Sequence, residues 1–172
     1  MTIYRGVSER TVTNISGVYL REMTAQLSSH FQTNLDSQFS QIHTITNAIS
    51  EKDLQDEASM KRFLVQAQKD NDFTHIAFIS DKGIAYAADG AVPAMSKISG
   101  LDKLLGDSGK LISVNENIWE SSTILLGTTM TPIQFGDSQL VAIIIGLHTS
   151  DIGSRLGMDS ETAVSYTHLT LP

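Results

Sequence analysis

Apolar residues recur every three or four positions from Ile15 to Ile49, and this stripe constrains the fold more than any other feature. The stripe runs through Ile15, Tyr19, Met23, Leu27, Phe31, Leu35, Phe39, Ile42, Ile45 and Ile49. Such spacing places the apolar side chains on one face of an α-helix, and no proline interrupts the segment. The sequence therefore predicts one long amphipathic helix from about Val7 to Ile49.

The predicted helix is too long for the rest of the chain to cover. About 40 residues at 1.5 Å each extend over roughly 60 Å, whereas a compact domain of this size measures only about 40 Å across. The protruding part is expected to pair with a second copy of the chain or to continue a membrane-anchored stalk. Because the apolar spacing does not keep a strict 3.5-residue period, no regular coiled coil is predicted.

Beyond residue 49 the pattern changes to a second helix and five short strands. The helix begins at Asp56 or Glu57 and ends near residues 69–72. The predicted strands are Phe73–Ser80, Ile84–Ala88, Lys110–Val114, Ser122–Pro132 and Leu140–His148. A short helix over Ile98–Leu105 separates the second strand from the third, and a final helix begins at Thr149 or Ser150.

Tight turns such as Asp81-Lys82-Gly83 connect neighbouring strands, which makes these neighbours antiparallel. The expected fold class is α+β: a PAS-like five-stranded antiparallel sheet with the long N-terminal stalk helix packed on it. We expect three segments along the chain. Residues 1–49 form the stalk helix, residues 50–157 form the sensor core, and residues 158–172 form a disordered or non-native tail.

Composition and motifs exclude several classes of function. The net charge is -7, with 12 Lys and Arg that do not cluster, so nucleic-acid binding is not expected. The chain has no cysteine, and its five histidines lack the spacing of metal ligands, so no metal or cofactor is expected. Neither a nucleophile elbow nor a phosphate-binding loop is present. Paired acids such as Asp56-Glu57 lie at helix ends, where capping explains them.

We expect the chain to be a piece of a larger protein. The longest apolar run, Leu140–Ile145, is far shorter than the roughly 20 residues that span a bilayer. The final segment, Val164–Pro172, shows neither a helical stripe nor strand alternation, and it resembles a non-native read-through peptide. A natural unstructured tail is the alternative.

Four segments together resemble a bacterial Cache domain, the PAS-like extracytoplasmic sensor module of membrane receptors. They are the stalk segment Val18–Thr24, the hairpin Phe73–Gly83, the strand Ile124–Thr129, and Leu140–Leu147 running into Thr149–Ile152. The likeness covers roughly residues 15–157. It implies a ligand-sensing input domain whose transmembrane anchor and output enzyme, such as a diguanylate cyclase or histidine kinase, lie outside this chain. It also implies a small-molecule ligand of unknown identity, a homodimer through the N-terminal helix, and a location at the cell membrane, on its extracytoplasmic side.

The residues that a PAS-like pocket would use are polar or aromatic and lie near the predicted strands. They are Tyr86, Asp89, Trp119, Thr128 and Met130. The amphipathic ring of Trp119 suits a pocket wall, although it could instead cover a sheet edge. Asp89-Gly90 could equally be a plain turn.

No arginine lies between Arg62 and Arg155, so the sheet lacks the bidentate carboxylate clamp of Cache domains that bind amino acids. Either the ligand is not a free amino acid, or Arg62 reaches in from the second helix, or the domain senses a partner and binds no small molecule. Two other functions stay open. The chain could be a structural dimerisation module of a membrane protein, or, as the least favoured hypothesis, a small hydrolase.

Overall fold

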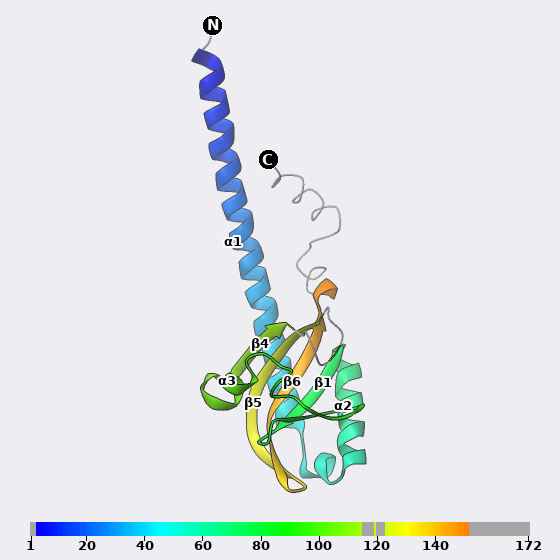
Figure 1. The fold of residues 1–172 in the computed structure, drawn as a ribbon. Coiled ribbons are helices and arrows are strands. Elements are labelled where there is room, and N and C mark those ends of the chain that lie inside the picture. Colours follow the sequence, from blue (N-terminus) through cyan, green and yellow to red (C-terminus); the bar gives the residue numbers. More distant parts are fainter. Residues whose placement is uncertain (1–2, 115–118, 120–122, 152–172) are drawn as a thin grey trace.

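The long N-terminal helix and the antiparallel sheet organise the computed structural model, which describes residues 3–114, 119 and 123–151 (Figure 1). Helix α1 covers Ile3–Ala48, and α2 covers Glu57–Asn71 after a 3-10 turn, η1, at Glu51–Leu54. The strands are β1 (His75–Ser80), β2 (Ile84–Ala87), β3 (Gly90–Pro93), β4 (Lys110–Val114), β5 (Thr123–Phe135) and β6 (Ser138–His148). Between β3 and β4 lie α3 (Leu101–Lys103) and a π-helical turn, η2 (Leu104–Ser108).

All six strands form one antiparallel sheet in the order β3-β2-β1-β6-β5-β4. The α+β class, the antiparallel sheet and the long helix are therefore confirmed. The predicted number of five strands is corrected to six, because Gly90–Pro93 pairs with β2 as an additional edge strand. This strand has only four residues and begins with glycine and ends with proline, so it carries no strand signal in the sequence.

Helix α1 extends far beyond the sheet at its N-terminal end (Figure 1). Its 46 residues correspond to about 70 Å of helix. Only its C-terminal third is buried, where Leu35, Phe39, Ile42 and Ile45 pack against β5 and β6. Closer to the N-terminus, the side chains of Val18 and Tyr19 are 61% and 62% exposed.

Helices α1 and α2 cover the same face of the sheet. Helix α2 lies along β1, and the ring of Phe63 stacks on Phe78 with 6.0 Å between the ring centres. One apolar cluster joins both helices to this face, including Met60 and Leu64 of α2 and Ile143 and Ile145 of β6. Burial of this cluster fixes both helices on the sheet.

A second apolar cluster covers the opposite face. The segment between β3 and β4 contributes Ile98, Leu101 and Leu104, which are buried against small and branched sheet residues such as Ala85 and Ile144. The sheet is therefore the middle of three layers, with helices on one side and the α3 segment on the other.

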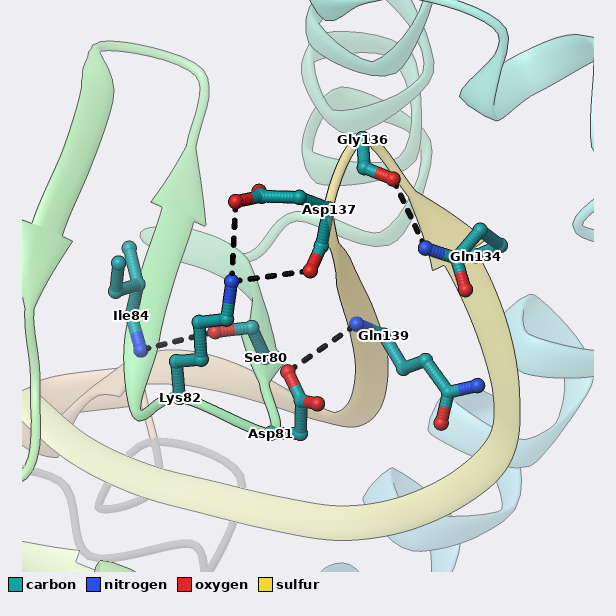
Figure 2. A network of polar contacts seen from close by, with 8 residues as sticks. All are labelled: Ser80, Asp81, Lys82, Ile84, Gln134, Gly136, Asp137 and Gln139. Carbon is teal, nitrogen blue, oxygen red and sulfur yellow. Dashed lines mark hydrogen bonds and ion pairs between the residues drawn. The ribbon is translucent and has the colours of Figure 1, made fainter.

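The tip of the β5–β6 hairpin is tied to the β1–β2 turn by polar contacts (Figure 2). The Lys82 ammonium lies 3.2 Å from an Asp137 carboxylate oxygen and donates to the Asp137 carbonyl at 3.0 Å. The backbone N–H of Gln139 donates to the Asp81 carboxylate at 3.2 Å. These contacts join the tip of the β5–β6 hairpin to the β1–β2 turn at the surface.

The residues that follow β6 form the start of the helix that was predicted there. Thr149–Asp151 are helical. The rest of that predicted helix, and the tail predicted over residues 158–172, lie outside the described residues.

Candidate functional site

A hollow of about 100 Å³ lies between the first turn of α2 and the turn that joins β2 to β3. Its α2 wall consists of Glu57, Met60 and Lys61, and its other wall is the segment from Tyr86 to Ala91. Two of the residues predicted from the sequence, Tyr86 and Asp89, therefore line the same hollow. The hollow lies on the face of the sheet that carries α1 and α2.

The ring of Tyr86 is held in place by the hairpin tip. It packs edge-on against Phe135, with 5.3 Å between the ring centres and an interplanar angle of 72°. Both rings border the apolar cluster beneath α1 and α2. Such an edge-to-face contact fixes the ring orientation, so Tyr86 provides a rigid wall. Asp89, by contrast, is exposed on its turn.

The first turn of α2 is fixed by its N-cap residue. The backbone N–H of Ser59 donates to the Asp56 carboxylate at 2.6 Å, as expected for an acidic N-cap. The same hydrogen bond lowers the pKa of Asp56 below its ordinary value. The capping role predicted for the acids at this helix end is therefore confirmed for Asp56, and the next residue, Glu57, lines the hollow.

Thr128 and Met130 lie on the same face of the sheet but do not line the hollow. Thr128 is buried, and its hydroxyl donates to the carbonyl of Gly109 at 3.1 Å. It is paired with Lys110 across β4 and β5, so their side chains share a face. Met130 packs against the cluster beneath α1. Both residues are placed where helix and sheet meet.

Trp119 packs against the opposite face of the sheet. Its ring stacks on His75, with 4.8 Å between the ring centres, and borders the cluster that includes Leu101 and Leu104. The five predicted residues are thus divided between the two faces. Of the five, Tyr86 and Asp89 line the hollow beside α2.

The face beneath the α3 segment is densely packed. A Cβ atom added at Gly127 would lie 3.0 Å from side-chain atoms of Leu104 and Ile144. The large side chains of this layer, Ile98, Leu101 and Leu104, are at most 3% exposed. Apolar side chains therefore fill the centre of this face.

Met60 and Lys61 are site residues that the sequence did not single out, and Glu57 was considered there only as one of a pair of acids at a helix end. The helix that carries them was predicted, but periodicity does not reveal which end of it faces the β2–β3 turn. Within the described residues, no group of three His, Asp or Glu side chains could hold a metal ion. No described helix is long and apolar enough to cross a membrane.

Comparisons with known proteins identify the fold through structure alone. No protein-family model matches the chain, and no curated protein matches it in sequence. The sensory domain of the Campylobacter jejuni chemoreceptor Tlp3, with isoleucine bound, superimposes with a TM-score of 0.55 at 9% identity. The match covers 84% of this chain and 65% of the Tlp3 domain.

Two further sensor domains share the fold. The ligand-binding domain of Mlp24 with asparagine gives a TM-score of 0.56 at 14% identity, covering 85% of this chain and 62% of that domain. The Escherichia coli DcuS sensor domain gives 0.55 at 14% identity, covering 74% of this chain and 98% of DcuS. The chain thus spans less than two thirds of the Tlp3 and Mlp24 domains. At these identities the shared property is the fold, a PAS-like sheet with a long N-terminal helix.

Proposed function

We propose that the chain is the extracytoplasmic ligand-sensing input domain of a transmembrane signalling receptor of the Cache type. The observation that carries this proposal is a PAS-like sheet, shared with the Tlp3, Mlp24 and DcuS sensor domains, that is docked on a helix extending far beyond it. The domain itself catalyses no reaction. The output belongs to another part of the receptor, such as a diguanylate cyclase or a histidine kinase.

The positions of α1 and β6 support a role in transmitting a signal. Strand β6 ends on the side of the sheet from which α1 projects (Figure 1). The helix α1 that enters the sensor core and the chain that leaves it after β6 can then both be directed toward the same membrane. A second copy of the chain would pair along α1, where Val18 and Tyr19 are 61% and 62% exposed.

The hollow beside α2 provides a physical route from ligand to helix. Met60 lines the hollow and also belongs to the apolar cluster that contains Leu35 and Phe39 of α1. A ligand that moves the first turn of α2 would therefore alter the packing beneath α1. Signalling requires that the ligand bind two helix arrangements with different affinity, because equal affinity shifts no population.

A second candidate function is a structural dimerisation module of a membrane protein. Two observations favour it: the exposed Val18 and Tyr19 side chains of α1, and the close packing of Leu101 and Leu104 against the sheet among the described residues. In this function the hollow beside α2 would bind no ligand, and the chain would act only through pairing along α1.

Thermal unfolding of the 172-residue chain distinguishes the two functions. Small carboxylates, amines, amino acids, sugars and nucleobases are added in turn, and a sensor domain is expected to melt at a higher temperature with at least one class. A ligand at 100 times its Kd stabilises the native state by about 2.7 kcal/mol. The Tm shift is then measured again in Asp89→Asn and Trp119→Ala, and the variant in which the shift is lost identifies the face of the sheet that binds the ligand. If no class raises the Tm while sedimentation shows a dimer that Tyr19→Ser dissociates, the structural module is correct.

A further inference from the structure

The hollow beside α2 carries an excess of negative charge. Glu57 and Asp89 contribute two carboxylates from opposite walls, and Lys61 contributes one ammonium group. All three side chains are exposed, and none forms an ion pair with another described residue. A charged ligand could therefore bind these carboxylates without first breaking an ion pair in the domain.

The size of the hollow limits what can enter it. A volume of about 100 Å³ is several times the roughly 15 Å³ that one water molecule requires, but less than the 300 Å³ or more of pockets for drug-sized ligands. Met60 is buried at its base, and Ala87, Ala88 and Ala91 add little bulk to the wall. The hollow therefore fits a small charged group with a few carbon atoms.

The start of α2 does not favour an anion here, although helix N-termini often do. The Asp56 carboxylate already accepts the N–H of Ser59, and it adds a further negative charge beside Glu57. An incoming carboxylate would meet Glu57 and Asp89 with only Lys61 to attract it. The Lys61 side chain is long and exposed, so its charged end can remain in solvent when a cation binds.

We propose that this hollow binds a small organic amine in its ammonium form, with Asp89 and Glu57 as counter-charges and the Tyr86 ring as an aromatic wall. Charge-assisted hydrogen bonds to carboxylates and the attraction of cations to aromatic rings are the interactions that would recognise it. This inference rests on the proposed sensing function and names the ligand class for it.

The test is calorimetric titration and thermal melting of the 172-residue chain at constant ionic strength. The probes are methylammonium, ethylammonium and putrescine as amines, acetate and succinate as carboxylates, and glycine as a zwitterion. The amines are expected to bind and raise the Tm. Asp89→Asn and Glu57→Gln, which preserve side-chain shape, should each weaken amine binding by about fivefold or more.

Two further variants make the result specific. Asp102→Asn removes an exposed carboxylate from α3, away from the hollow, and should leave amine binding unchanged. Lys61→Met removes the one positive charge in the lining and should tighten amine binding by about twofold. An anion bound in the hollow would instead be lost in this variant.

Three results would overturn the amine proposal. Binding of a carboxylate that Lys61→Met abolishes would replace the amine by an anion and leave the sensing function intact. Amine binding that persists unchanged in Asp89→Asn and Glu57→Gln would place the amine elsewhere on the domain. If none of the three amines binds but another class of compound raises the Tm, the amine proposal is rejected and the sensing function is supported. If no class of compound has any effect, both proposals are contradicted.

Discussion

The ammonium group of Lys110 lies 4.8 Å from the centre of the Phe39 ring, so a cation on the edge strand β4 contacts the buried face of α1. Phe39 is only 5% exposed and sits among the apolar residues that fix α1 to the sheet. This contact joins the stalk helix to the strand farthest from α2 in the sheet order. Through this contact the edge of the sheet can influence α1.

The first prediction concerns this pair. Lys110→Met and Phe39→Leu, made singly and together, should give a coupling free energy of about 0.5–1 kcal/mol, because a cation beside an aromatic ring contributes this much when the cation is exposed to solvent, as Lys110 is. Urea unfolding of the four proteins measures it. The double-mutant cycle cancels the loss of apolar volume in Phe39→Leu. Additive effects of the two substitutions would mean that the contact contributes nothing.

The second prediction concerns Gln38, which is 2% exposed in the middle of the apolar stripe of α1. Its side-chain carbonyl is buried, and no described residue donates a hydrogen bond to it. Because an unsatisfied buried acceptor costs about 1–3 kcal/mol, Gln38→Met should raise the free energy of unfolding by about 1 kcal/mol. Chemical denaturation measures this change.

The control for Gln38→Met is Gln26→Met, since Gln26 is exposed on the same helix, α1. That substitution should change the stability little, as is usual for surface positions away from special features. A lower stability of Gln38→Met would indicate that the amide finds a partner in solution.

Periodicity in the sequence was sufficient to predict α1, because ten apolar residues at helical spacing leave few alternatives. The strands β4 and β6 were also located to within two residues. In contrast, β3 was missed, since Gly90 and Pro93 at its ends favour turns and its pairing depends on the neighbouring strand β2. Short edge strands gain their structure from tertiary contacts that local propensity does not contain.

The candidate site was predictable only in part, for a related reason. Tyr86 and Asp89 are close in sequence, so their shared position around one hollow follows from local structure. Trp119 was grouped with them on chemical type, yet it stacks on His75 at the other face of the sheet. Which face a side chain occupies depends on strand register and on where the helices pack, and neither was specified by the sequence pattern.

The third prediction concerns Gly146 in β6. A Cβ atom at this position would lie 2.8 Å from side-chain atoms of both Thr74 and Thr123. Gly146→Ala should therefore destabilise the domain by about 1–3 kcal/mol through overpacking. The midpoint of urea unfolding measures this loss.

Gly17→Ala is the matched control for Gly146→Ala. Gly17 lies within α1, and a Cβ atom there would meet nothing within 4 Å. Because alanine favours the helical conformation over glycine by about 0.5–1 kcal/mol, this variant should keep or increase the helix content measured by circular dichroism. Equal stability of Gly146→Ala and the wild type would show that the threonines move aside without cost.

The fourth prediction concerns the dependence of stability on pH. The hydrogen bond from the Ser59 backbone lowers the pKa of Asp56, and a hydrogen bond from the Ser50 side chain lowers that of Asp53. A carboxyl whose pKa is lower in the folded state stabilises the fold at pH values above its unfolded pKa, about 3.9. That contribution is lost as the pH falls through the lower folded pKa, because both states then bind the proton.

Unfolding free energies measured between pH 6 and pH 2 test this expectation. The wild type should lose stability on acidification through the region below pH 4. Asp56→Ser keeps a side-chain acceptor at the N-cap of α2 but has no carboxyl to protonate. Its stability should therefore fall less steeply over the same range. An equal slope in both proteins would mean that the Asp56 carboxylate is not held by the Ser59 N–H in solution, and the fixed first turn of α2 beside the hollow would lose its support.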